Sequence, residues 1–310
     1  MQVNDFMQGL AAKMVEGRGI TDTTARKYIA DLYRLNGNAP FKSLAWLKEE
    51  ETVRGRLEKY AESTRVTIMS AMVAALSGNR AYKRYHDKWA SELFDGRKEL
   101  DESQEARKGA KTEREAENWM AWDDVVARRE ELAKEVAALP AGALTPKQWD
   151  LLQQYLLVCL YSMIPPRRNL DYLAMVTSRN GKMPDATQNY WLPKDRKMVF
   201  NVYKTAKHHG PQELEVPVEL AEVLDLYMSR HPAGKGKGAA QARLLVKADG
   251  TAVTTANHIT RALNRVFGRK VGSNLLRHAY LSSKYDVSEM EADAEAMGHT
   301  VAEQREYLRK

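Results

Sequence analysis

The sequence predicts a mainly helical protein with a small antiparallel β-sheet, an α+β fold built in two domains. Apolar residues recur at helical spacing through most of the chain. Convincing strand signals are confined to one stretch, residues 189–218, which contains an apolar run, a polar turn and a run of alternating residues. A length of 310 residues also exceeds the size at which one hydrophobic core usually stops growing, which favours two domains.

Residues 1–95 form the first predicted domain, which is small and helical. Helical spacing is clear in TARKYIADLYRL and TRVTIMSAMVAALSG. Thr21 or Asp22 is expected to cap the second helix, which the turn residues at 37–40 should end. Several cations of this domain could face either water, the commoner case, or a phosphate backbone: Arg26, Lys27, Arg54 and Arg65.

The second predicted domain, residues 119–310, follows a charged segment. Residues 96–118 carry charges of both signs and almost no apolar side chains, so they cannot bury a core and are expected to form an exposed helix or linker. Helical periodicity returns at Trp119. Thr145, followed by Pro146 at the first helical position, begins the helix PKQWDLLQQYLLVCLYSMI.

A β-hairpin is predicted within this domain. The runs MVFNVY and ELEVPV flank a polar turn with Gly210 and Pro211, and the hairpin carries Lys204 near its turn. After Leu220 the chain is expected to be helical, apart from a basic loop at 231–243. That loop lacks the glycine and lysine spacing of a P-loop, so no nucleotide site is expected there.

Composition and charge restrict the function classes. A net charge of +7 favours a polyanionic partner, because neutralising phosphates releases condensed counterions. Cys159 is the one cysteine, which excludes a disulfide framework within the chain and indicates a reducing compartment; it is expected to be buried and inert. The N-terminus does not read as a signal peptide and no apolar run is long enough to span a bilayer. We expect a soluble, non-secreted protein of the cytoplasm or nucleoid, or of the nucleus or a viral factory in a eukaryotic host.

Four pieces of the second domain each offer a group suited to a phosphodiester. They are PPRRNLDYL, VYKTAKHHG, SNLLRHAYLSSKY and MGHTVAEQREYLRK. Breaking a phosphodiester without a metal requires a nucleophile, cations around the non-bridging oxygens and an acid for the leaving oxygen. The four pieces contain all three kinds of group.

The order of these groups resembles the catalytic residues of the tyrosine recombinase, or phage integrase, family. That family has an arginine after a helix, a hairpin lysine, an arginine followed by histidine, a glycine-histidine pair and a tyrosine near the end. The resemblance covers about the last half of the chain, and its strongest motifs are LLRHAYLSS and MGHTVAEQREY. The helical N-terminal domain is similar in kind to the core-binding domain of the family.

The resemblance implies a role for each matched residue. Tyr307 would attack the scissile phosphate and form a 3′-phosphotyrosine, while Lys204 protonates the departing 5′ oxygen. His299 would bind a phosphate oxygen or shuttle a proton. His278 is expected in the core or supporting the site, with a direct site role as the alternative. The histidine pair at 208–209 lacks a carboxylate or cysteine cluster, so no metal is expected, and no cofactor.

Two positions depart from the family pattern. Arg277 and one of Arg167 and Arg168 would grip the non-bridging oxygens. Arg168 is the first choice because Asp171 stands three residues later, where the family often has a supporting carboxylate; Arg167 is the second. Asn274 occupies a position where the family usually has histidine, so it can donate a hydrogen bond to phosphate but cannot titrate.

The resemblance therefore implies a site-specific recombinase or integrase that cleaves and rejoins DNA without metal or ATP. Its partners would be double-stranded DNA with an inverted-repeat site and further copies of the chain, from dimer to tetramer, and no membrane. A telomere resolvase or type IB topoisomerase-like enzyme would share this chemistry. A catalytically weak or inactive DNA-binding protein of the same fold is the remaining alternative, motivated by the asparagine and by the unusual PPRR segment.

Overall fold

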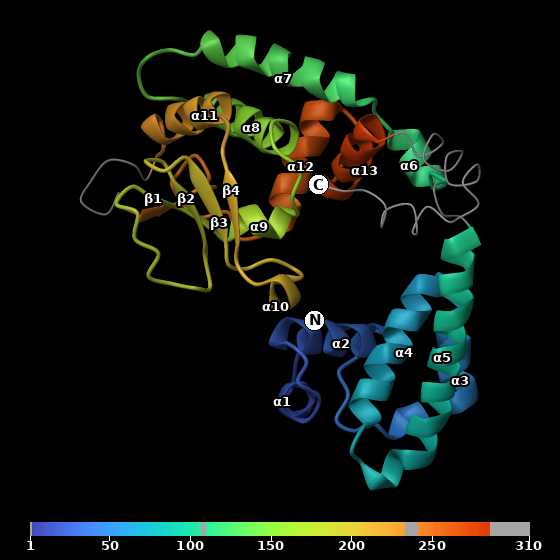
Figure 1. Cartoon of the computed structure of the whole chain (residues 1–310). Coiled ribbons are helices and arrows are strands. Elements are labelled where there is room, and N and C mark those ends of the chain that lie inside the picture. The colour runs from blue at the N-terminus through green and yellow to red at the C-terminus, as the bar shows by residue number, and fades with distance from the viewer. Residues whose placement is uncertain (1, 107–109, 233–240, 286–310) are drawn as a thin grey trace, which may run out of the picture. The chain divides into compact units, whose positions relative to one another are not determined.

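The computed structural model describes residues 2–106, 110–232 and 241–285. It divides into two compact units, Met1–Lys111 and Thr112–Lys310 (Figure 1). Helices make up most of both, and the second also holds a five-stranded sheet, so the predicted α+β class is confirmed. The expected linker at 96–118 is mostly helical. Its first part continues the last helix of unit one, and its last part is a short helix of unit two.

Unit one is a helical bundle with its own core. Thr21 caps its second helix by accepting a hydrogen bond from the Thr24 amide, and that helix ends at Leu35, as predicted. The fourth helix is buried along most of its length, and Trp89 from the fifth lies in the core. The elements are α1 (Asp5–Arg18), α2 (Asp22–Leu35), η1 (Ala45–Lys48), α3 (Glu50–Leu57), α4 (Glu62–Leu76), η2 (Arg80–Tyr82) and α5 (Lys83–Ala106).

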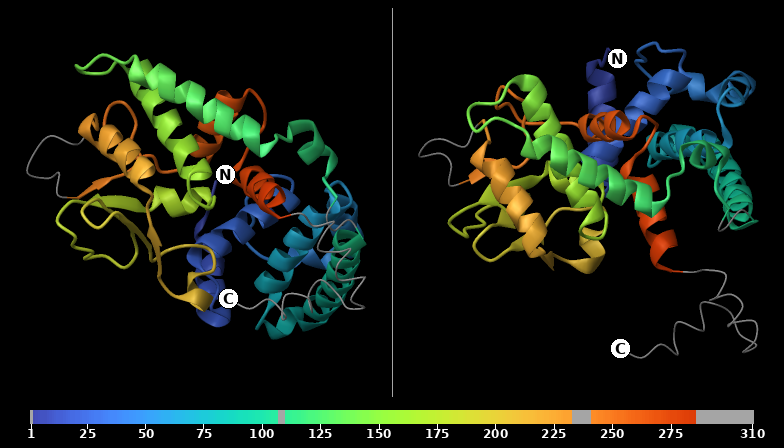
Figure 2. Two further views of the ribbon diagram at one scale, coloured as in Figure 1. Left: turned by 45° about the horizontal axis from the view of Figure 1, so that its top comes forward. Right: turned by 90° about the horizontal axis from the view of Figure 1, so that it is seen from above.

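Unit two is organised around one apolar helix, α8 (Pro146–Ser162), against which α7, α11, α12 and α13 pack (Figure 2). Its N-terminus is the predicted one, because Thr145 and Gln148 form a reciprocal capping box. Cys159 is fully buried in this helix, as expected. The other helices are α6 (Glu113–Asn118), α7 (Trp122–Ala137), α9 (Asn169–Leu173), α10 (Ala206–His209), α11 (Val218–Ser229), α12 (Ala256–Phe267) and α13 (Ser273–Lys284).

The sheet of unit two has strand order β4-β3-β2-β1-β5. The strands are β1 (Met175–Ser178), β2 (Asn189–Leu192), β3 (Lys197–Phe200), β4 (Gln212–Glu215) and β5 (Gln241–Arg243). The antiparallel pair β3 and β4 is the predicted hairpin, and Lys204 lies in its connection.

Three expectations about unit two were wrong. The sheet is mixed, because β1 and β2 pair in parallel. Strands β1, β2 and β5 were not predicted, and β5 forms the end of the expected basic loop at 231–243. Residues 244–255, which were expected to be helical, contain no helix and hold an isolated bridge between Val246 and Ala252. The physical reason that the strands were missed is their length: each has three or four residues, and β1 and β2 are buried throughout, so none shows an alternating pattern.

Among the helices of the described ranges, none combines the length and apolar character that crossing a bilayer requires.

Candidate phosphate-binding site

Three arginines meet at one small cavity in unit two. Its volume is about 280 Å³, and its walls include Arg167 and Arg168 before α9, Asp171 within α9, and Arg277 on α13. The hairpin supplies the remaining polar wall, with Tyr203, Thr205 and His209 in its connection and Gln212 at the start of β4. The first and third of the four phosphate-related pieces are therefore brought together, beside the connection that contains the second.

Arg167 is the most firmly held of the three arginines. Its Nε donates to Asp171 Oδ2 at 3.0 Å, and its Nη1 donates to Gln212 Oε1 at 3.1 Å. The guanidinium also lies over the Phe200 ring, 3.8 Å from the ring centre, with Tyr203 on the hairpin connection 5.2 Å away. These contacts join the segment before α9 to both strands of the hairpin.

Asp171 is buried beneath these cations. Burial raises the pKa of its carboxyl, although the neighbouring Arg167 charge acts in the opposite direction. Its Oδ2 pairs with Arg167, while Oδ1 has no hydrogen-bond partner among the described residues. The carboxylate therefore orients one arginine without neutralising the cavity, whose three arginines and one carboxylate leave a formal charge of +2.

Arg277 reaches the cavity from α13. Burial lowers the pKa of its guanidinium, and the charges of Arg168 and Arg167 act in the same direction. The cations are thus close enough to repel one another, which is unfavourable unless an anion lies between them.

The choice of Arg168 over Arg167 for the scissile phosphate stays a prediction, since both arginines line the cavity. Asp171 pairs with Arg167, four residues earlier, instead of Arg168, three residues earlier. Arg168 has an extended backbone, at φ −76° and ψ 150°, and directly precedes the first residue of α9. The two arginines therefore lie outside the helix, and helical spacing does not decide which of them faces Asp171. Both arginines line the cavity, and Arg168 makes no ion pair within the described part of the chain.

The remaining predicted site residues are less closely grouped. Lys204 is exposed and stands between two lining residues, Tyr203 and Thr205. Asn274 is exposed in the first turn of α13 and does not line the cavity. Tyr307 and His299 lie outside the described residues.

The expectation of a core position for His278 was wrong, while a supporting role at the site stays a prediction. Its side chain is 56% exposed, and its Nδ1 lies 3.1 Å from Glu115 Oε1. Adjacent residues on a helix point about 100° apart, so the turn of α13 that aims Arg277 at the cavity directs His278 outward.

Sequence analysis missed the residues that connect the walls of this site. Asn189, at the start of β2, is fully buried and hydrogen-bonds both to the segment of Asp171 and to the hairpin connection. Gln212 and Tyr203 hold the guanidinium of Arg167. Their only signal in the sequence was nearness to the predicted hairpin, because each contact joins residues far apart along the chain.

No group of three or more metal-ligating side chains occurs in residues 2–106, 110–232 or 241–285. The histidine pair at 208–209 ends α10, and His209 lines the arginine cavity.

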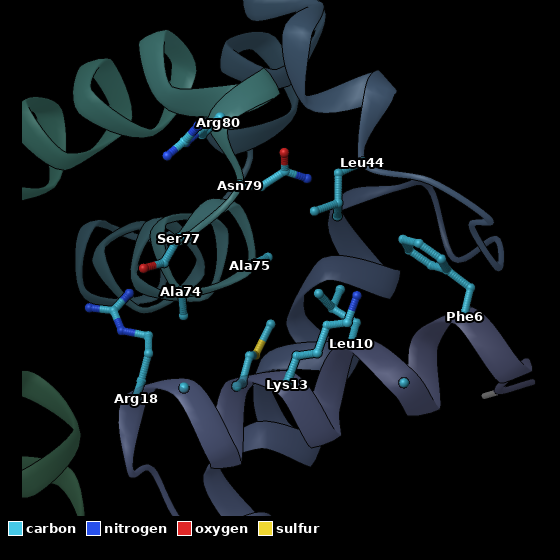
Figure 3. Close-up of a pocket in the computed structure, with 14 residues that line it drawn as sticks. Phe6, Leu10, Lys13, Arg18, Leu44, Ala74, Ala75, Ser77, Asn79 and Arg80 are labelled. Atoms are coloured by element: carbon cyan, nitrogen blue, oxygen red, sulfur yellow. The ribbon is translucent and has the colours of Figure 1, made fainter.

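A second basic surface lies in unit one, in a groove of about 510 Å³ between α1 and the end of α4 (Figure 3). Lys13 and Arg18 come from α1 and Arg80 from η2, while Ser77 and Asn79 add polar groups. Among the described residues, no acidic side chain lines this groove. Its charge suits an extended anion.

Comparison of the chain with known proteins finds no matching family, no matching curated protein and no matching solved structure.

Proposed function

We propose that this chain is a site-specific DNA recombinase of the tyrosine recombinase class. The single observation that carries the proposal is the convergence of Arg167, Arg168 and Arg277 on one cavity beside the hairpin connection. The resemblance assigns Arg277 and one of Arg167 and Arg168 to the scissile phosphate, and the structure brings Arg277 to the other two from a distant part of the sequence.

The electrostatics of the cavity favour a phosphodiester as its occupant. Burial and the neighbouring arginines disfavour the charged form of Arg277, so a bound anion would relieve that cost. A planar guanidinium presents two parallel donors to phosphate oxygens, which gives geometric selectivity as well as charge. Such donors stabilise the extra charge that a phosphodiester develops in the transition state.

The proposed reaction conserves the phosphodiester energy in a protein-DNA bond. Tyr307 loses its phenolic proton, its oxygen bonds to phosphorus, and the bond from phosphorus to the 5′ oxygen breaks. Lys204 donates a proton to that leaving oxygen, and His299 binds a non-bridging oxygen or shuttles a proton. Attack by a 5′ hydroxyl of another strand reverses these steps and regenerates the tyrosine.

Contacts to the DNA backbone would come from both units. The groove of Lys13, Arg18 and Arg80 has the charge that a phosphate backbone requires, and such contacts position a protein without reading sequence. On an inverted-repeat site we expect two copies of the chain, and four copies when two sites exchange strands. The compartment would be the one that holds the DNA, the cytoplasm or nucleoid, or the nucleus or a viral factory.

The test is a covalent-adduct assay with EDTA present throughout. Duplexes that the protein retards are selected from a random pool, nicked near the centre of the bound site, and incubated with wild type, Tyr307→Phe or the control Tyr285→Phe. We expect an adduct on a denaturing gel with wild type and the control, and none with Tyr307→Phe. Retarded DNA without any adduct would favour the non-catalytic DNA-binding alternative, and failure to retard DNA at low salt would refute both.

A further inference from the structure

Asn189 uses its whole side-chain amide to join two backbone segments. Its Nδ2 donates to the Asp171 carbonyl at 2.7 Å and to the Val202 carbonyl at 2.9 Å. Its Oδ1 accepts from the Val202 amide at 2.8 Å. The residue is 0% exposed, so every one of these bonds is shielded from water.

These bonds replace a strand partner at the point where the sheet ends. The β2–β3 ladder pairs Tyr190 with Val199. Beyond Phe200 the chain leaves β3, and the Asn189 amide then satisfies both the N–H and the C=O of Val202, as a neighbouring strand would. An adjacent bond, from Asn201 Nδ2 to the Gln188 carbonyl at 2.9 Å, ties the same turn to the same strand.

The two segments that Asn189 joins carry different parts of the proposed site. Asp171 holds Arg167 at the phosphate cavity. Val202 stands two residues before Lys204, whose own side chain is exposed and makes no hydrogen bond or ion pair with the described residues. The distance between the arginines and the lysine therefore depends in part on this buried amide, which joins the two segments by their backbones.

We propose that Asn189 is a positioning residue that sets where Lys204 stands relative to the phosphate held by the arginines. This inference rests on the proposed strand-cleavage function and adds a residue to it. When the bond from phosphorus to the 5′ oxygen breaks, its electron pair moves to that oxygen and the Lys204 ammonium supplies the proton. A displaced lysine would slow this transfer while leaving the arginines and the nucleophile in place.

The test replaces the leaving oxygen by sulfur. A thiolate is a far better leaving group than an alkoxide and does not need an acid, so a 5′-bridging phosphorothiolate bypasses Lys204. On the oxygen substrate we expect cleavage to slow by about 10²-fold or more in Lys204→Ala. Asn189→Leu should slow it by about 10-fold to 10²-fold, since misplacement by about 1 Å costs that much. On the sulfur substrate both variants should cleave within a few-fold of wild type.

Two further variants separate positioning from folding. Asn189→Asp keeps an acceptor for the Val202 amide and loses the donors, so it should show the same selective loss on oxygen. Leu224→Ala removes a buried side chain of α11 and leaves a cavity in the core, away from the hairpin connection. Any loss of cleavage rate in this variant should be equal on the oxygen and sulfur substrates. In the double variant Lys204→Ala/Asn189→Leu, oxygen cleavage should be no slower than in Lys204→Ala alone, because both changes act on one step.

The outcomes distinguish the two proposals. If wild type cleaves DNA and the Asn189 variants lose the same cleavage rate on the oxygen and sulfur substrates, or lose none, the positioning role is refuted. The strand-cleavage function would stand in that case. Absence of an adduct from wild type on both substrates would refute the function, and the positioning role with it.

Discussion

Replacing Arg167 and Arg168 one at a time by alanine should separate the folding role of one from the binding role of the other. Arg167 makes two side-chain hydrogen bonds, stacks on Phe200, and is the ion-pair partner of a carboxylate that is 5% exposed. Removing one member of a buried pair costs about 3–5 kcal/mol. Since Arg167 retains 18% exposure, we expect the low end, about 3 kcal/mol. Arg168 has no ion pair in the described ranges, so its loss should cost under about 1 kcal/mol.

Peptide-resolved hydrogen exchange is the appropriate assay, because it measures unit two without interference from unit one. Amides of the buried helix α8 exchange through opening of the unit. A loss of about 3 kcal/mol speeds their exchange by about two orders of magnitude. Arg167→Ala should show this acceleration, and Arg168→Ala should exchange within a few-fold of wild type while losing DNA cleavage. Equal acceleration in the two variants would refute the reasoning.

The pH dependence of the stability loss in Arg167→Ala is a second check on the cause of that loss. Burial holds the folded-state pKa of Asp171 above its ordinary value. A carboxyl whose pKa is higher in the folded state than in the unfolded state stabilises the fold at pH values below its unfolded-state pKa. That stabilisation is lost as the pH rises through the folded-state pKa. Removing the Arg167 charge should raise that pKa further, so the deficit of Arg167→Ala should be larger at pH 7 than at pH 5. A stability loss in Arg167→Ala that does not change with pH would contradict an unpaired carboxylate as its cause. So would a loss that is no smaller when Asp171→Asn is added to Arg167→Ala in a double variant.

Two other predictions concern groups away from the arginine cavity. Burial raises the pKa of the Cys159 thiol to about 12, so the thiol of the folded chain should resist iodoacetamide at pH 8. The chain unfolded in urea should react promptly. Fast labelling of the native protein would contradict the burial of Cys159. The second prediction replaces Lys13, Arg18 and Arg80 together by alanine. The slope of log K for DNA binding against log salt concentration should become shallower by up to about 2.7, the value for three phosphate contacts. Gly17→Ala in the same groove is a control that leaves the charge unchanged. An unchanged slope in fluorescence-anisotropy titrations would remove this groove from the DNA contact surface.

Local features of the chain were predictable because their physics is local. The caps at Thr21 and Thr145 depend on side chains within three residues of the helix start, and both were confirmed. The β3–β4 hairpin was predictable from the apolar run MVFNVY and the alternating run ELEVPV on either side of a polar turn with Gly210 and Pro211. Strands β1, β2 and β5 were not, because each is short and is defined by its pairing with a distant segment.

The site divides in the same way. The amino-acid sequence alone was enough to predict the kinds of group at the site and their order: paired arginines after a helix, a hairpin lysine, and an arginine on a later helix. It was not enough to predict that Asp171 holds Arg167 rather than Arg168, that His278 points outward, or that Asn189 bonds to the hairpin connection. The physical reason is that side-chain direction at a loop, and the partner of a buried amide, depend on contacts between residues remote in sequence, which residue spacing does not specify.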